Sequence, residues 1–386
     1  VLSQIDRLCH TEKSKNSPFD DSVREEGEWV LTEHDDISAV LKAAERLGYE
    51  LSEEDGIKVF EAFAGYGGAS FGLKRSGVKH EVIGFSEIDS SAIQILETNF
   101  PKIKNYGDIK TIADELEKDS TYLPDFDMFT GGFPCQPFSS AGLQLGEEDK
   151  LGRGTLIYEI IRICRIKKPQ YILLENVKGF KSAKFKKTRD ALTAGLGNEY
   201  DIRMEVLNTM NYGIPQNRER LWIFAYKGKL PAEFSLIPPM EEEYTPPRLH
   251  EFLDQEPPAS VYLTDAQVRR FRDSHAKHGC HNFSVNEPLC FDVYNHKIKT
   301  NGLCNTITEP SHNITRIIEP RRNGVLRIRK LSIDEQFRLM GFKMTPNKKE
   351  IKFPETLNYT QISARAGNGW DVNLVGILIK HIFKQL

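Results

Sequence analysis

The sequence has few cysteines, no long apolar run and no large excess of charge of either sign. Its six cysteines are scattered along 386 residues, so we expect no dense disulfide framework and favour a reducing environment. No apolar run reaches the roughly 20 residues of a membrane helix and no secretory leader is evident, which predicts a soluble, cytoplasmic protein without a membrane partner. The formal net charge of −3 excludes a globally basic chain. A local basic cleft for nucleic acid remains compatible with that charge.

An apolar content of 39% over 386 residues is enough for one large core and a smaller second domain. Residues 1–55 are polar and charged, and we predict an N-terminal extension of unknown role there. From Ile57 onward, short apolar runs alternate with helical patterns, which is typical of an α/β sheet. The expected strands are 57–63, 81–88, 126–130, 171–176, 203–208 and 220–226, and the clearest helices are 89–100 and 155–168.

The order of these runs predicts a sheet that is parallel over its first half. No clear helix separates the last two runs, so we expect them to form an antiparallel hairpin at one edge. Residues 228–260, which follow, are rich in proline and glutamate. We therefore predict a first domain at 56–227 and a second, smaller and irregular domain at 228–350. Residues 351–386 include an apolar helical pattern at 372–383 and are expected to return to the first domain.

A glycine-rich turn, AGYGG (64–68), follows the first strand directly and precedes a helix. Glycine lets the backbone turn tightly and lets a ligand approach the carboxyl edge of the sheet. The second strand ends at Glu87, where nucleotide folds commonly place an acid that binds ribose, and Asp108 lies where a third strand would end. Together these features favour an adenosine-type ligand, although ordinary turns and solvated acids would give the same residues. The turn lacks the Gly-Lys-Ser/Thr ending of a phosphate loop, which argues against an NTPase.

The most specific segment is GGFPCQPFS (131–139), which follows a predicted buried strand. Prolines on both sides of Cys135 restrict the backbone and fix the direction of the thiol. A cysteine at the carboxyl end of a strand faces the same crevice as the glycine turn. A nucleophilic role for Cys135 competes with the commoner fate of a free thiol, which is to be buried and inert. We interpret the other five cysteines in this second way.

This segment resembles the Pro-Cys-Gln motif of the DNA (cytosine-5) methyltransferases, and the rest of that family's ordered set accompanies it. The other motifs are FAGYGG (63–68), ENV (175–177), QNRER (216–220), RKLSIDEQFRLMGF (329–342) and Gly367-Asn368. Six motifs in the family's order, over about 57–386, identify the chain as a member of the prokaryotic or phage modification type. The resemblance implies that 56–227 forms a Rossmann-like sheet that uses S-adenosylmethionine, and that 228–350 is a target-recognition domain.

The resemblance also implies a mechanism and its residues. Carbon 5 of cytosine is a poor nucleophile, and addition of the Cys135 thiolate at carbon 6 makes it electron-rich enough to accept a methyl group. Glu175 would donate a proton toward N3, which predicts a pKa raised by burial. Arg220 would hold the cytosine O2, and Arg218 would orient its loop or contact phosphate. No side chain is evident as the base that removes the carbon-5 proton, and water is an alternative.

By the same resemblance, S-adenosylmethionine and its product S-adenosylhomocysteine would lie against residues from both ends of the matched region. These are Phe63, Gly65, Gly67, Glu87, Ile88, Asp108, Leu156 and Asn368. The chain departs from the family after Asn368, because Gly369-Trp370 stands where Ser or Ala followed by Val is usual. Contacts from these two positions are therefore in question. One interpretation is that Trp370 packs against the final helix.

Attack on carbon 6 needs access to the ring face, so the target cytosine must swing out of the duplex. The resemblance implies contacts with the DNA from Pro134, Gln136, Ser139 and Gln216. Residues 316–330 carry six basic residues against one acid. This favours phosphate contacts from Arg316, Arg321 and Arg322, with an exposed basic strand that binds no ligand as the alternative.

Two other functions stay open at this point. A tRNA cytosine methyltransferase shares much of the motif set, but the serine after Pro137-Phe138 and the sizeable variable region favour DNA. A non-catalytic DNA-binding protein would not need the catalytic residues intact. The crowded HAKHGCH (275–281) suggests zinc, but its spacing is not that of a zinc finger, so no metal is predicted. We expect a monomer that acts on duplex DNA, with a restriction endonuclease for the same site as a further partner.

Overall fold

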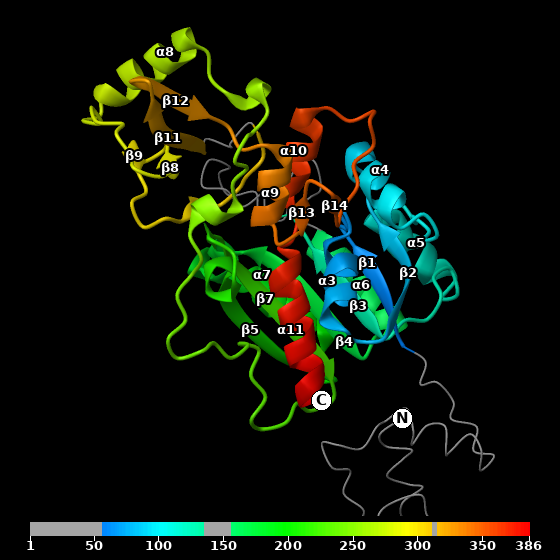
Figure 1. The fold of residues 1–386 in the computed structure, drawn as a ribbon. Helices are drawn as coiled ribbons and strands as arrows, with labels where there is room; N and C mark the ends of the chain where they lie inside the picture. The colour runs from blue at the N-terminus through cyan, green and yellow to red at the C-terminus, as the bar shows by residue number, and fades with distance from the viewer. Residues whose placement is uncertain (1–55, 135–155, 311–314) are drawn as a thin grey trace, which may run out of the picture. The chain divides into compact units, whose positions relative to one another are not determined.

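The computed structural model describes residues 56–134, 156–310 and 315–386, and its largest element is a six-stranded sheet of order β2-β1-β3-β4-β7-β5 (Figure 1). The strands are β1 (Ile57–Ala62), β2 (His80–Ser86), β3 (Met128–Gly132), β4 (Tyr171–Val177), β5 (Tyr200–Asn208) and β7 (Glu219–Lys227). β1 pairs in parallel with β2 and β3, and β3 with β4, whereas β7 runs antiparallel to both β4 and β5. The parallel first half and the antiparallel pair at one edge confirm the strand pattern predicted from the sequence.

Helices cover both faces of this sheet because the buried strands are apolar on both sides. One face packs against α5 (Ile109–Lys118), α6 (Leu156–Lys167) and α7 (Lys186–Leu196), and the other against α3 (Gly68–Ser76) and α11 (Val372–Gln385). In β4, Ile172 and Leu174 belong to the first layer and Leu173 to the second. Helix α4 (Ser90–Asn99) follows β2. The last helix lies along α3, as the apolar pattern of 372–383 predicts (Figure 1).

One predicted strand does not form within residues 56–134. Asn105 makes only a single parallel bridge with Phe85, and α5 begins directly after Asp108. Gly107 adopts a left-handed φ of 80°, and the Asp108 carboxylate caps α5 by accepting a hydrogen bond from the Lys110 amide at 3.0 Å. This turn and cap begin a helix in place of a strand. The prediction of a third strand that ends at Asp108 is therefore wrong.

The region after the large sheet is more regular than predicted. It contains α8 (Asp265–Ala276) and a four-stranded antiparallel sheet of order β12-β11-β8-β9. The strands are β8 (Leu289–Asp292), β9 (Lys297–Ile298), β11 (Arg316–Arg322) and β12 (Val325–Arg329). Phe283, Phe291, Ile318, Leu326 and Ile328 form its own apolar core. Most of these strands are too short to give a clear alternation in the sequence.

Short elements join the two sheets. Strand β6 (Gln216–Asn217) precedes β7 and pairs in parallel with β10 (Cys304–Asn305). After β12 the chain forms α9 (Ile333–Leu339), β13 (Met344–Thr345), β14 (Lys348–Lys349) and α10 (Tyr359–Asn368). The 3-10 turns are η3 (Lys178–Lys181), η4 (Ala183–Phe185), η5 (Thr209–Tyr212), η6 (Leu249–Phe252) and η7 (Ala259–Val261). Among the helices of the described residues, none has both the length and the hydropathy to cross a membrane.

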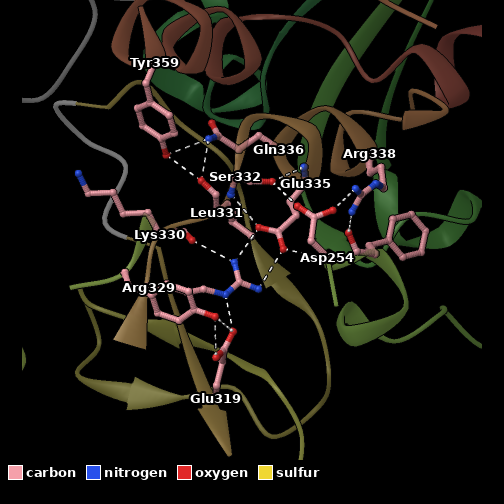
Figure 2. Close-up of polar contacts among 12 residues, drawn as sticks. Asp254, Glu319, Arg329, Lys330, Leu331, Ser332, Glu335, Gln336, Arg338 and Tyr359 are labelled. Carbon is pink, nitrogen blue, oxygen red and sulfur yellow. Dashed lines mark hydrogen bonds and ion pairs between the residues drawn. The ribbon is translucent and has the colours of Figure 1, made fainter. Parts of the chain in front are cut away.

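A buried ionic network lies between β12 and α9 (Figure 2). Arg329 is fully buried and donates to Glu319 of β11 at 2.6 Å and to both carboxylate oxygens of Glu335 at 2.7 and 2.9 Å. Glu335 also accepts a hydrogen bond from the Ser332 amide at 2.7 Å within the capping box of α9. Because a guanidinium holds a carboxylate in one fixed geometry, this network fixes α9 relative to the small sheet.

Candidate active site

The glycine turn after β1 is held by Glu87, which lies just past the end of β2. Its Oε2 accepts a hydrogen bond from the Gly65 amide at 2.8 Å, and its Oε1 accepts from the Ile88 and Asp89 amides at 2.8 and 2.9 Å. Gly65 and Gly67 have positive φ angles of 56° and 90°, which glycine adopts without steric cost. A Cβ added at Gly65 would meet no atom within 4 Å. The turn therefore leaves open space beside a backbone fixed by a carboxylate.

A pocket opens at the carboxyl ends of β1 and β3. Its lining consists of Glu61, Ala62, Phe63, Ala64, Gly65, Gly68, Gly131, Gly132, Asn368, Gly369 and Trp370. Phe63, Gly65 and Asn368 are thus three predicted cofactor residues that the fold brings together from both ends of the matched region. No lining residue is basic, and Glu61 is the charged one.

The other predicted cofactor residues do not line the pocket. Gly67 caps α3, and Glu87 reaches the lining through its bond to the Gly65 amide. Ile88 has a side chain that is 73% exposed, although it is large and apolar. Asp108 caps α5, and Leu156 is buried at the first residue of α6. Of these residues, Glu87 is the one that a hydrogen bond connects to the lining.

Glu175 lies on β4 at the same edge, beside Gly132 of β3 and opposite Trp222 of β7. It is only 9% exposed, and its Oε1 lies 2.8 Å from Nε of Arg220. Burial raises the pKa of Glu175, and the charges of Arg220 and Arg218 oppose that rise without cancelling it. The pKa shift predicted from the sequence is confirmed in direction and cause. A carboxyl group in this setting can hold a proton at a higher pH than an exposed one.

Asn176, the next residue, positions the segment that leads to the predicted nucleophile. Its side-chain amide donates to the Phe133 carbonyl at 3.2 Å, and its side-chain oxygen accepts from the Val177 amide at 2.8 Å. The Phe133 ring packs edge-on against Phe180 at 5.4 Å between centroids. Pro134 follows at this edge of the sheet, whereas Cys135, Gln136 and Ser139 lie outside the described residues.

Comparison with known proteins assigns the chain to a family. The family model for C-5 cytosine-specific DNA methylases matches residues 57–384. The chain belongs to this family. It is 33% identical to the type II methyltransferase M.NgoBI of Neisseria gonorrhoeae over 326 residues, which are 82% of this chain and 90% of that protein. It is also 33% identical to the type II methyltransferase M.HaeII of Haemophilus aegyptius over 339 residues, 85% of this chain and 93% of that protein.

The fold of the methylase is also that of a solved relative. The crystal structure of the Schizosaccharomyces pombe (S. pombe) Dnmt2 methyltransferase superimposes with a TM-score of 0.61 at 19% identity. The match covers 85% of this chain and 98% of that one. It shows the shared fold, which includes the α/β sheet and the smaller second region. The family match over residues 57–384 confirms the resemblance found in the motifs.

Two predicted site residues of the methylase serve its internal structure. Arg218 is 2% exposed, and its guanidinium donates to the carbonyls of Ile307, Gly367 and Gly369 at 3.0, 3.2 and 2.7 Å. Burial lowers its pKa to about 9. Gln216 is fully buried, accepts from the Ile307 amide at 2.8 Å and donates to a carbonyl of α9 at 2.6 Å. Arg218 thus ties the residue before β7 to the segment that carries Gly369 of the pocket lining, whereas Gln216 ties β6 to Ile307 and to the end of α9.

The basic residues of 316–330 have different environments. Arg321 and Arg322 are exposed at the hairpin between β11 and β12. Arg316 is partly buried, which lowers its pKa. Arg329 is buried in the network of Figure 2, and Arg327 stacks 4.1 Å above the Tyr262 ring. Charge counting along the sequence therefore overestimates the basic surface, because part of this charge is neutralised inside the protein.

The histidine cluster forms contacts between rings. Nδ1 of His275 lies 2.7 Å from Nδ1 of His296, and the His278 ring stacks on His296 with 3.8 Å between centroids. Within the part of the chain that the structure describes, no three His, Cys, Asp or Glu side chains are grouped so that they could hold a metal ion.

Two residues of the pocket lining, Glu61 and Trp370, were not predicted from the sequence to lie there. Glu61 is buried beneath the turn and accepts hydrogen bonds from the Ala69 and Ser70 amides at 2.8 and 3.1 Å. A lone acid in an otherwise apolar strand is the signal that could have revealed it. Trp370 shares an apolar cluster with Leu374 and Leu378 of α11, as one interpretation of the sequence proposed. Its place in the pocket lining was not predicted, because its motif departs from the family there.

Proposed function

We propose that this methylase transfers a methyl group from S-adenosylmethionine to carbon 5 of a flipped-out cytosine in duplex DNA. The observation that supports this most is the buried Glu175–Arg220 pair, which lies at the same sheet edge as the pocket and as Pro134. A proton donor, a cation and the residue before Cys135 are thus gathered beside one cavity. This is the set of groups that the chemistry of cytosine requires.

The pocket residues fit S-adenosylmethionine. With no basic residue in the lining, the site does not suit a phosphate, whereas Glu61 suits a ligand that carries ammonium and sulfonium groups. Burial raises the pKa of Glu61 to about 7, and a cation bound nearby would lower it again. Glu87 has lone pairs left for a ribose hydroxyl, because a carboxylate accepts about four hydrogen bonds and three are in use. When bound, S-adenosylmethionine supplies an electrophilic methyl group.

The side chains of the protein carry the remaining chemistry. The Cys135 thiolate forms a bond to carbon 6, and the electron pair of the carbon 5–carbon 6 double bond becomes available at carbon 5. Negative charge that develops on the ring is neutralised when the protonated Glu175 donates at N3. After the methyl group is in place, carbon 5 loses its proton to a base, for which water is our candidate. The electron pair of that C–H bond re-forms the carbon 5–carbon 6 double bond as the sulfur–carbon 6 bond breaks. Cys135 leaves as a thiolate, and Glu175 takes back the proton from N3.

Arg220 has donors available for the base. A guanidinium carries five N–H groups, and the contacts made among the described residues use Nε with Glu175 and Nη1 with the Glu219 carbonyl. Nη2 is therefore the group that we assign to the cytosine O2. Arg218 acts as a positioning residue, since its Nη1 and Nη2 atoms already donate to three backbone carbonyls.

We infer that residues 228–350 recognise the target and that 56–227 with 351–386 perform catalysis, with 1–55 as an extension. Arg316, Arg321 and Arg322 would contact phosphates of the duplex, and Gln136 and Ser139 would contact the DNA at the target base. The relatives are named type II methyltransferases, which supports a restriction endonuclease for the same site as a partner. We propose a monomer that works on DNA in the cytoplasm.

The direct test is methyl transfer by the purified protein from labelled S-adenosylmethionine to duplex DNA and to tRNA. We expect label in 5-methylcytosine of DNA. Label in tRNA alone would overturn the choice of substrate, and no label in either would favour a non-catalytic binding protein.

The role of Cys135 has its own test. Cys135→Ser should abolish transfer and leave DNA affinity within about tenfold, a difference of roughly 1.4 kcal/mol. Cys164→Ser is the matched control, because Cys164 is buried in α6 and should not affect the reaction beyond a modest loss of stability. A duplex with 5-fluorocytosine at the target should trap a covalent adduct with the wild type and with the control only. Turnover by Cys135→Ser would remove Cys135 from this role.

A further inference from the structure

Trp370 connects the cofactor pocket with Glu175. It lines the pocket together with Asn368 and Gly369, yet its side chain extends to β3 and β4 behind the pocket. A Cβ built on Gly132 would lie 2.6 Å from the indole Nε1 and 3.5 Å from Oε2 of Glu175. The indole Nε1 and this carboxylate oxygen therefore lie close to the same point above Gly132, and a hydrogen bond from Trp370 is one of the contributions that lower the pKa of Glu175.

Three neighbouring residues, Gly369, Tyr66 and Trp222, fix the position of Trp370. A Cβ on Gly369 would come within 2.0 Å of the Tyr66 ring, so the residue before Trp370 has to be glycine. The Tyr66 hydroxyl donates to the Trp370 carbonyl, and the indole packs edge-on against Trp222 with 5.0 Å between centroids. Gly369 and Trp370, which depart from the family's motif, therefore both match the packing around them: glycine leaves room for the Tyr66 ring, and the indole packs against Trp222.

We propose that Trp370 is a positioning residue for Glu175, holding one carboxylate oxygen while Arg220 holds the other. Nε of Arg220 lies 2.8 Å from Oε1, and Oε2 is the oxygen on the side of the indole. Two donors on opposite oxygens fix the rotation of the carboxyl group and thus the direction in which it presents its proton. The inference rests on the proposed function, because it gives Glu175 its role as the proton donor to the base.

The contact also predicts a pH effect. The charged or titratable groups around Glu175 are Arg220 and Arg218 from the start of β7 and Tyr66 from the glycine turn. A hydrogen bond to the carboxylate favours the ionised form and so lowers its pKa. Loss of the indole N–H therefore raises the pKa of Glu175. Since Glu175 must be protonated to donate, the fall in rate at high pH should begin at a higher pH in a variant without that N–H.

The structure offers a matched pair of variants, Trp370→Phe and Trp222→Phe. Both remove an indole from the same apolar layer, but Nε1 of Trp222 has no hydrogen-bond partner among the described residues. Only the first variant therefore removes a donor. We expect Trp370→Phe to lower the single-turnover rate about tenfold, or about 1.4 kcal/mol in the barrier. We also expect the fall in rate on the alkaline side of the pH–rate profile to shift to higher pH. Trp222→Phe should leave the pH of that fall unchanged. If the rate of both variants falls at the same alkaline pH, the proposal is overturned.

A second measurement does not depend on catalysis or on a folded variant at position 370. The chain has three tryptophans, and Trp222→Phe reduces the indole N–H signals in a spectrum of ¹⁵N-tryptophan-labelled protein to two. We expect one remaining signal to shift with pH, and Glu175→Gln to remove that shift. No pH-dependent indole signal in the wild type would overturn the contact. If the signal titrates but the wild type methylates neither DNA nor RNA, the proposed function fails while the contact stands.

Discussion

At Glu175, burial and positive charge act in opposite directions on one carboxyl group. Burial raises its pKa, whereas Arg220, Arg218 and Trp370 favour its ionised form. The outcome is a raised pKa in a group whose orientation is fixed by donors. A proton donor at neutral pH needs this combination, because a carboxyl group with an ordinary pKa near 4.3 would be ionised.

Arg220→Met should show how much of this arrangement depends on the ion pair. Removal of the guanidinium takes away a donor to Oε1 of Glu175 and the group assigned to the cytosine O2. We expect the single-turnover rate to fall about 10²-fold or more, as for other preorganised donors, and the pKa of Glu175 to rise further. The measurement is the rate of methyl transfer at saturating DNA over a range of pH.

Arg203→Met is the control for that change. Arg203 lies on the neighbouring strand β5 and pairs with Asp201 away from the pocket lining. Its loss should leave the rate and its pH profile close to those of the wild type. If both variants lose the same activity, the effect of Arg220→Met comes from damage to the sheet, and the assignment to the base is contradicted.

For helices and strands, the sequence predicted the structure where an apolar pattern extended over several consecutive residues. Strands β1, β2, β4 and β7 have apolar runs that the alternation with helices makes recognisable, and their parallel or antiparallel order follows from what lies between them. The strand predicted before Asp108 is absent because the left-handed turn at Gly107 and the Asp108 cap begin a helix there. Strands of two residues, such as β6 and β9, have no periodicity to detect.

The site could be predicted only as far as its motifs extend. Glu175 and Arg220 were proposed because each lies in a family motif, and the structure places their side chains in direct contact. Trp370 and Glu61 were missed because tertiary packing determines what they touch. The internal bonds of Arg218 and Gln216 were equally invisible, since a motif does not show whether a polar side chain faces a ligand or the backbone of its own protein.

The ionic network of Figure 2 should stabilise the packing of α9 against β12. Arg329→Met leaves the fully buried Glu335 without a cation and leaves Glu319 with Arg327 at 3.6 Å as its remaining ion pair. Loss of one partner from a buried pair costs about 3–5 kcal/mol, so the free energy of unfolding should fall by that amount. Urea unfolding measures it.

Arg321→Met, in the exposed hairpin that leads into β12, is the matched control. It should change the free energy of unfolding by no more than about 0.5 kcal/mol. A loss for Arg329→Met as small as that of the control would mean that the network does not stabilise this packing.

For the whole molecule, the chain beyond residue 56 forms one compact unit built from both ends. Helix α11 covers the sheet next to α3, and an apolar cluster joins residues of the glycine turn, such as Tyr66, to Phe337 and Phe342 beyond the small sheet. The pocket lining therefore draws on segments about 300 residues apart, since the Tyr66 hydroxyl reaches Trp370 over a separation of 304 positions. Such a site forms only when the entire unit is folded, so changes in the small sheet are expected to affect the pocket as well as DNA recognition.

A molecule with a net charge of −3 must bind a polyanion through local positive charge. Arg321 and Arg322 are exposed together, so the double change to Gln should weaken DNA binding and reduce the slope of log K against log salt by about 1–2. Lys74→Gln with Lys118→Gln is the matched control, because both lysines lie in the last turns of helices that run away from the carboxyl edge of the sheet. Titrations with labelled duplex at several salt concentrations give the slopes. Identical slopes for the two double variants would place the phosphate contacts on another surface.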